Sequence, residues 1–173
     1  GPDDRLMSQQ MVFQSAVTAA RESIQIVTPY FLPEATLIAA LNTASIRGVR
    51  VDIVLPGRSN LPFVHWAMMA HIRQVLVYDC RVWLTPPPFD HSKLMVVDGE
   101  WVCLGSAPWD ARSLRLNFEF NIECFGRSLG RDLSHRIDAR IADAQRLRQA
   151  DLDAQPLPVR LRDGVARLFL PYL

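Results

Sequence analysis

Residues 23–55 read SIQIVTPYFLPEATLIAALNTASIRGVRVDIVL and contain two strand-like segments on either side of a helix-like one. Residues 23–28 and 49–55 alternate apolar and polar side chains, which is the pattern of a β-strand with two different faces. Residues 34–47 between them are expected to be helical, and Gly48 is suited to end a helix because glycine adopts positive φ without strain. A strand, a helix and a second strand in succession indicate an α/β protein.

The rest of the chain continues this alternation of strands and helices. Further helices are expected at residues 8–21, with Ser8 as the N-cap, and at residues 62–76 and 129–149. Further strands are expected at residues 81–84, 94–97, 101–104 and 117–124. These elements predict an α/β fold in which a mixed β-sheet is sandwiched between helices. We expect residues 1–150 to form the domain and residues 151–173 to form a C-terminal tail that packs on the domain or on a membrane.

The length and composition fit one globular domain. The chain has 173 residues, and no apolar run reaches the roughly 18 residues that a membrane span needs. Its formal net charge is +1, whereas a protein that grips nucleic acid usually has a basic excess. Cys80, Cys103 and Cys124 are widely spaced, which favours buried thiols over a disulfide framework or a zinc site.

Lys93 is the one lysine among the 19 lysine and arginine residues of the sequence. Lysine and arginine are not interchangeable where a compact ammonium group is needed, because guanidinium is larger and planar. The alternative is coincidence, since a single lysine had to occupy one of the basic positions. The neighbours of Lys93 decide between these two interpretations.

The segment from residue 89 to 126 carries the residues suited to chemistry. It contains His-x-Lys, four residues, Asp98, six residues, and Gly-Ser. In an extended strand His91 and Lys93 leave the same face, because side chains alternate with a period of two. A neutral imidazole can attack a phosphodiester while an ammonium group neutralises the charge that develops on the phosphate oxygens.

Two further side chains in this segment can support that chemistry. Ser106 can donate a hydrogen bond to the same phosphate oxygens. A nucleophilic imidazole also needs its second nitrogen held, which a carboxylate does well. Glu119 lies on the polar face of the predicted strand 117–124 and is the candidate for this role.

The spacing resembles the HKD motif of the phospholipase D superfamily. TPYFLPE, RGVRVDIVLPG and the run from HSKLMVVDG to NFEFN resemble the C-terminal half of a bacterial cardiolipin synthase, and the likeness covers nearly the whole chain. The resemblance implies that His91 is the nucleophile or the acid/base and that Lys93 and Ser106 bind phosphate. It further implies that Glu119 orients His91 and that Asp98 supports the motif strand.

The sequence departs from the family pattern at one position. The family usually has asparagine two residues after the motif serine, where this chain has Pro108. Proline has neither an amide side chain nor a backbone N–H, so one phosphate contact is either missing or supplied from elsewhere. Asn117 and Asn121 are the candidates, and Asn117 is the first choice as a phosphate ligand.

The family's active site takes two HKD motifs that face each other, and this chain has one. His65, His71 and His135 have no lysine two residues on, which favours core or surface roles for them. The resemblance therefore implies a second HKD domain, supplied either by a second copy of the chain or by the same longer protein. The opening GPDD resembles the start of the second half in two-motif members, which favours a fragment.

The function expected from the resemblance is phosphatidyl transfer, most simply the synthesis of cardiolipin from phosphatidylglycerol through a phosphohistidine. We expect anionic phospholipid as substrate, a peripheral location on the cytoplasmic face of a bacterial inner membrane, no nucleic acid, and no cofactor or metal. The alternatives are a homodimeric nuclease of the same superfamily and a catalytically silent half. Arg131, Arg136, Arg140, Arg146 and Arg148 either bind lipid head groups or belong to a solvated helix face, which the interleaved aspartates favour.

Overall fold

A computed structural model of the protein describes the backbone of residues 2–106, 109–110 and 120–169 and the side chains of residues 10–106 and 120–169. The main sheet contains β1 (Ser23–Val27), β3 (Arg50–Pro56), β4 (Arg81–Thr85), β5 (Leu94–Val97), β6 (Trp101–Gly105), β8 (Asn121–Phe125) and β9 (Gln145–Leu147). Two short strands, β2 (Phe31–Leu32) and β7 (Trp109–Asp110), pair separately in parallel. The helices are α1 (Pro2–Ala19), α2 (Ala35–Ile46), α3 (Pro62–Leu76), α5 (Arg127–Ala142), α6 (Gln149–Asp153) and α7 (Leu157–Phe169).

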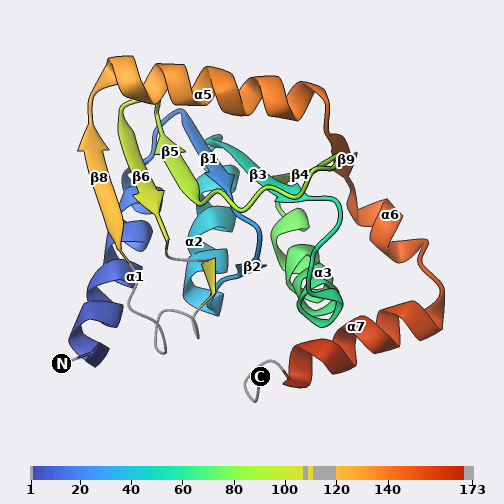
Figure 1. The fold of residues 1–173 in the computed structure, drawn as a ribbon. Helices are drawn as coiled ribbons and strands as arrows, with labels where there is room; N and C mark the ends of the chain where they lie inside the picture. Colours follow the sequence, from blue (N-terminus) through green and yellow to red (C-terminus); the bar gives the residue numbers. More distant parts are fainter. Residues whose placement is uncertain (1, 107–108, 111–119, 170–173) are drawn as a thin grey trace.

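The main sheet is mixed, as the sequence predicts. Its strand order is β8-β6-β5-β1-β3-β4-β9, with β8 and β9 at the two edges (Figure 1). The strands β1, β3 and β4 run parallel, and Ile26 of β1 pairs with Ile53 of β3. On the other side of β1 the strands β5, β6 and β8 are antiparallel neighbours, and Met95 of β5 pairs with Ile26. The sheet thus has a parallel half and an antiparallel half that meet at β1.

Helices cover both faces of the sheet, because successive side chains of its strands point to opposite faces. Ile24 and Ile26 of β1 belong to the apolar core under α1, α2 and α3. Val27 belongs to a smaller core under α5, which runs across the strands (Figure 1) and contributes Ile137. The predicted sandwich of a mixed sheet between helices is therefore confirmed.

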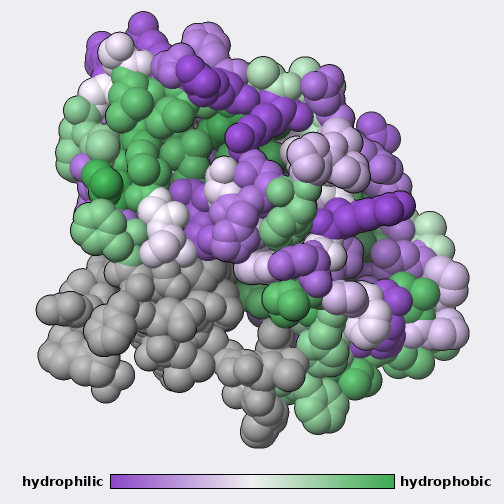
Figure 2. All heavy atoms as spheres, viewed as in Figure 1, coloured by the Kyte–Doolittle hydropathy of each residue, from purple (hydrophilic) through white to green (hydrophobic). Residues whose placement is uncertain are grey.

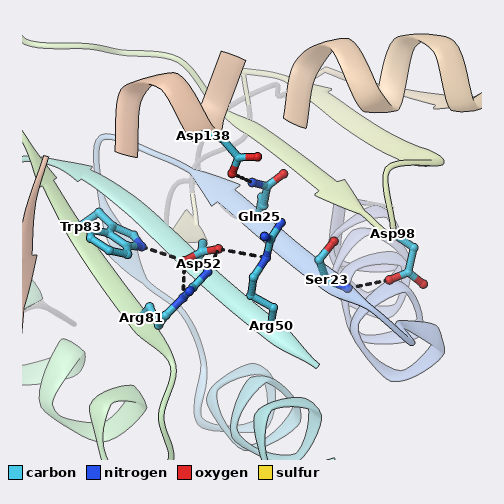
Figure 3. Close-up of polar contacts among 8 residues, drawn as sticks. All are labelled: Ser23, Gln25, Arg50, Asp52, Arg81, Trp83, Asp98 and Asp138. Atoms are coloured by element: carbon cyan, nitrogen blue, oxygen red, sulfur yellow. Dashed lines mark hydrogen bonds and ion pairs between the residues drawn. The ribbon is translucent and has the colours of Figure 1, made fainter. Parts of the chain in front are cut away.

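The parallel half encloses a buried carboxylate. Asp52 of β3 has no exposed surface, and it accepts hydrogen bonds from Arg81 at 2.5 and 2.8 Å and from the Trp83 indole at 2.7 Å. Arg50 lies 3.5 Å from the same carboxylate (Figure 3). A buried charge is tolerated only when it is paired and hydrogen-bonded, so these three donors account for the presence of Asp52 in the sheet.

Three predicted elements were wrong in their bounds or type. α1 begins at Pro2 and not at an N-cap Ser8, since proline is compatible with the first turn of a helix. The predicted helix 129–149 ends at Ala142, and residues 145–147 instead pair antiparallel with β4, where Leu147 is buried. The predicted strand 117–124 is observed as Asn121–Phe125, and residues 117–119 lie outside the described residues.

The C-terminal segment forms two helices that the sequence did not predict. α6 and α7 follow β9 and pack on α3 (Figure 1). Arg73 of α3 pairs with Asp153 and donates to the Leu152 carbonyl at 3.0 Å. Pro156 and Pro158 do not prevent α7, because prolines at the start of a helix remove only N–H groups that have no intrahelical partner.

Candidate active site

His91 and Lys93 lie together in the extended segment that leads into β5. The strand begins at Leu94, as predicted, so His91 and Lys93 come directly before it. The sequence instead predicts that both residues belong to an extended strand. The Lys93 ammonium nitrogen Nζ is 3.4 Å from His91 Nδ1 and 3.5 Å from Nε2, and it donates to the His91 carbonyl at 3.3 Å. His91 is exposed and Lys93 half-buried, which leaves the imidazole accessible beside a positive charge.

Aromatic rings border the imidazole of His91. The Tyr30 ring meets it edge-on with centroids 6.1 Å apart, and the Phe89 ring lies at 6.0 Å. The Tyr30 hydroxyl donates to Asn60 Oδ1 at 2.7 Å. Tyr30 and Asn60 follow β1 and β3, so the loops at the carboxyl ends of two parallel strands meet at His91. We assigned no site role to Tyr30 or Asn60 from the sequence, although Tyr30 falls in the TPYFLPE stretch.

Asp90 places a negative charge next to the His-Lys pair. Its carboxylate accepts the Ser92 N–H at 2.8 Å and pairs with Arg140 of α5. Partial burial raises the pKa of Asp90, but the Ser92 hydrogen bonds and the electrostatic interactions with Arg140 and His91 outweigh it and lower that pKa below its usual value. Asp90 therefore fixes the segment before β5 to α5 as an ionised carboxylate at neutral pH.

Gly105 and Ser106 lie beside the motif because β6 pairs with β5. The Gly105 N–H donates to the Lys93 carbonyl at 3.2 Å. A side chain at Gly105 would meet Asn121 Oδ1 and the Phe120 carbonyl at 2.2 Å, so only glycine allows β8 to pass this closely. Ser106 Oγ accepts the Phe120 N–H at 2.9 Å, which anchors its hydroxyl at the start of β8.

Asn121 and Lys93 line the same small hollow. The second candidate for a replacement phosphate ligand therefore lies on the Lys93 side of the sheet. Asn117, Glu119 and Pro108 lie outside the described residues. The orienting role of Glu119 and the phosphate-binding role of Asn117 stay predictions.

Asp98 lies at the opposite end of β5 from Lys93, five residues away along the extended chain. Its carboxylate accepts three backbone N–H groups, from Arg21 at 2.9 Å and from Glu22 and Ser23 at 2.8 Å each. The Ser23 contact is drawn in Figure 3. Asp98 thereby ties the β5–β6 connection to the junction between α1 and β1, a contact with backbone and not with a reacting group.

The turn that contains Asp98 also favours this residue type. Asp98 and Gly99 both have positive φ, 53° and 62°, and the Glu100 N–H donates to the Val97 carbonyl at 3.0 Å. A type I′ hairpin turn requires positive φ at both central residues, and Asp-Gly is a favoured pair there. The Asp of the motif thus forms the turn and holds it in place.

The other three histidines lie on α3 and α5, away from the His91–Lys93 pair in the sequence, and arginines of α5 form ion pairs. His65 and His71 lie on α3, and His135 is exposed on α5. Burial lowers the pKa of His65, and Asp163 and Arg162 on α7 act on it in opposite directions. Arg136 pairs with Asp132 on α5, and Arg140 pairs with Asp90. These pairs support the interpretation of α5 as a solvated face. Within the described ranges no three His, Cys, Asp or Glu side chains gather as metal ligands.

Comparison with known proteins adds the family. A sequence model described as "Cardiolipin synthase, PLD-like domain" matches residues 14–141, which include the whole described part of the site. The chain is 32% identical over all its 173 residues to the major cardiolipin synthase ClsA of Bacillus subtilis, of which it covers 36%. A cardiolipin synthase of Staphylococcus aureus is 29% identical over the same length. The chain therefore spans about a third of the length of the curated relatives it matches.

Solved structures confirm the fold. The phospholipase D family member Nuc from Salmonella typhimurium has a TM-score of 0.67 at 22% identity, over 80% of this chain and 90% of that one. Phosphatidylserine synthase from Haemophilus influenzae has a TM-score of 0.72 at 18% identity, over 94% of this chain and 44% of that one. At these identities the likeness concerns the arrangement of the sheet and helices.

Proposed function

Because the chain belongs to the cardiolipin synthase family with a phospholipase D-like domain, we propose that it supplies one histidine of a two-histidine site for phosphatidyl transfer. The observation that carries the proposal is the contact between the Lys93 ammonium and the exposed His91 ring, at 3.4–3.5 Å. A phosphate group that meets the imidazole is then also within reach of the ammonium. The second histidine comes from another HKD domain, in the same longer protein or in a second copy of this chain.

The proposed reaction has two steps with phosphatidylglycerol as donor. In the first, the imidazole of one motif attacks phosphorus, and the bond from phosphorus to the glycerol oxygen breaks. The histidine of the other motif gives its proton to the leaving glycerol. In the second step the hydroxyl oxygen of another phosphatidylglycerol attacks phosphorus, the bond from phosphorus to the imidazole nitrogen breaks, and the hydroxyl proton passes to the second histidine. Cardiolipin leaves, and both histidines return to their starting states. His91 serves as the nucleophile or as the acid/base.

The surrounding residues have separate roles in this scheme. Lys93 neutralises the charge on the non-bridging phosphate oxygens as the transition state forms, with Ser106 and an asparagine as further donors. Tyr30 and Phe89 restrict the orientation of the His91 ring, since both pack against it. Because these donors neutralise the phosphate charge without a metal ion, we expect full activity in EDTA.

We further propose that the enzyme lies peripherally on the cytoplasmic face of the inner membrane, where its lipid substrate is found.

Product analysis tests the proposal. The chain is joined to a second HKD domain and given phosphatidylglycerol, and the lipid products are identified by mass spectrometry. Cardiolipin is the expected product, with a phosphatidyl group trapped on a motif histidine at short times. Cleavage of DNA without lipid transfer would instead support the nuclease alternative, and inactivity on both substrates would support a catalytically silent half.

A further inference from the structure

α7 has an inner face that packs on the domain and an outer face that does not. Asp163 and Ala166 on its inner side are 5% and 1% exposed, and α7 makes extensive contact with α3. Five large apolar side chains remain exposed by half or more of their surface: Leu157, Leu161, Val165, Leu168 and Phe169. With roughly 100° between successive helical residues, these five fall within an arc of about 120° opposite the buried side.

Arginines lie on both edges of this outer face. On the same helical projection Arg162 follows one edge of the arc, while Arg160 and Arg167 precede the other. The acidic residue of the helix, Asp163, is buried and pairs with Arg162 at 2.8 Å. Arg162 also lies over the Trp66 ring at 4.4 Å, which helps hold α7 on α3. The solvent side of α7 is therefore an apolar stripe with Arg160 and Arg167 along one edge, while the charge of Arg162 on the other edge is paired with Asp163.

The exposed apolar surface at β8 can be compared with that of α7, and the two differ in the partner that each suits. Figure 2 shows apolar side chains gathered over the β8 side of the sheet and, separately, over α7 at the lower right. β8 is an edge strand, which leaves backbone N–H and C=O groups for another polypeptide. In α7 the helix already satisfies its backbone, and it offers apolar side chains and positive charge. A lipid surface, which offers no peptide groups, fits α7 and not β8.

We propose that the outer face of α7 inserts into the head-group region of a bilayer that contains anionic phospholipid. The inference rests on the proposed phosphatidyl-transfer function for the presence of such lipid near the enzyme. The five apolar side chains enter the boundary between head groups and acyl chains, and Arg160 and Arg167 remain at the level of the phosphates. No described helix is long and apolar enough to cross a membrane, so α7 lies on the bilayer as an interfacial helix.

This placement gives α3 and the site loops a fixed relation to the bilayer. α7 is attached to α3 by its packing and by the contact of Arg162 with the Trp66 ring, and α3 follows the loop that contains Asn60. Asn60 in turn accepts the Tyr30 hydroxyl beside His91. Docking through α7 therefore orients the loops around His91 relative to the lipid surface from which the substrate comes.

Vesicle flotation with the complete chain tests the proposal without any turnover. The chain is mixed with vesicles of equal parts phosphatidylglycerol and phosphatidylcholine, and separately with pure phosphatidylcholine. We expect binding to the anionic vesicles and at least tenfold weaker binding to the neutral ones. The double variant Leu161→Glu/Leu168→Glu should lose at least tenfold in binding, and Arg160→Gln/Arg167→Gln should lose roughly fivefold per arginine.

The matched control is Met11→Glu/Ile46→Glu on α1 and α2. Met11 and Ile46 are 63% and 66% exposed, against 61% and 71% for Leu161 and Leu168, so the control adds equal charge to equally exposed positions. It should bind like the parent chain, and thermal unfolding confirms that each variant is folded. Equal binding by parent and α7 variants, or equal binding to both vesicle types, would overturn the proposal.

The remaining outcomes separate this proposal from its rival and from the proposed function. If the α7 variant keeps vesicle binding but no longer associates with a second HKD domain in size-exclusion chromatography, α7 is a protein interface and the proposal fails. If phosphatidyl transfer occurs but the α7 variants bind vesicles normally, the proposal fails and the function stands. If α7-dependent binding is observed without transfer, the function fails and the proposal stands.

Discussion

The two halves of the main sheet use a carboxylate in different ways. In the parallel half Asp52 is fully buried and binds the side chains of Arg81 and Trp83. In the antiparallel half Asp98 lies in a turn and binds three backbone N–H groups, while His91 at the other end of β5 is exposed. The parallel half therefore serves stability, and the antiparallel half presents the side chains suited to chemistry. Substitutions in the two halves should have separable effects.

The largest effect is expected at His91. In a complete two-motif enzyme, His91→Ala should lower kcat by at least about 10⁴-fold, because neither the attack on phosphorus nor the protonation of the leaving group has another candidate in this motif. The free energy of unfolding should stay within about 0.5 kcal/mol, since the side chain is exposed. His135→Ala on α5 is the matched control and should change neither quantity. A folded His91→Ala enzyme with normal kcat would show that His91 takes no part in the reaction and that the antiparallel half does not carry the chemistry.

Lys93→Arg is expected to have the next largest effect on activity. Guanidinium keeps the positive charge but is too large and planar to take the ammonium position beside His91, so kcat should fall roughly 100-fold. Arg136→Lys, an exposed position on α5, tests whether such exchanges are tolerated elsewhere and should leave kcat unchanged. Normal rates for Lys93→Arg would show that charge alone is needed and that the single lysine is a coincidence.

The two carboxylates should differ in what they cost the fold. Asp52→Ala removes the buried acceptor that the partly buried Arg81 and Trp83 side chains share, and should lower the free energy of unfolding by about 3 kcal/mol. Asp98→Ala removes the acceptor of three backbone hydrogen bonds and replaces a residue that tolerates positive φ, and it should lower the free energy of unfolding by about 2 kcal/mol. Chemical denaturation measures both, with Asp132→Ala on α5 as a surface control. If Asp98→Ala abolished turnover without loss of stability, Asp98 would have a role in the chemistry.

The smallest expected effect concerns pH and the α3–α7 contact. Burial lowers the pKa of His65 below its ordinary value of 6.5, so the unfolded chain binds a proton more readily than the folded one. Burial of the neutral His65 ring therefore contributes fully to the free energy of unfolding above pH 6.5. This contribution is lost as the pH falls from 6.5 through the pKa of His65 in the folded chain. His65→Gln should therefore reduce the loss of thermal stability between pH 7.5 and pH 5. An unchanged pH dependence would show that other groups cause it.

The sequence predicts the elements whose signals are local. α3 is observed at Pro62–Leu76 and β5 at Leu94–Val97, both as predicted. The helical spacing of apolar residues indicates α3, and the short apolar run indicates β5, so each signal lies within the element itself. β9 and α7 were missed because their stability depends on distant partners: β9 pairs with β4, and α7 packs on α3. Neither partner can be inferred from the residues of the element itself.

The same division applies to the site. The spacing of His91 and Lys93 predicts that their side chains lie together, and they do. The partners of Asp98 are backbone N–H groups 75–77 residues earlier in the chain, and a backbone group leaves no signal in the sequence. Tyr30 lies in a stretch that resembles the family, but only the pairing of β1 with β5 brings its ring to His91.

The most direct test of the two-histidine account is the rate of phosphatidyl transfer from phosphatidylglycerol as a function of chain concentration, with the oligomeric state measured in the same samples. The account predicts no turnover by the monomeric chain, and activity that appears only when the chain dimerises or is joined to a second HKD domain. Substantial turnover by a proven monomer would contradict it, because a single motif would then carry out both the attack and the protonation.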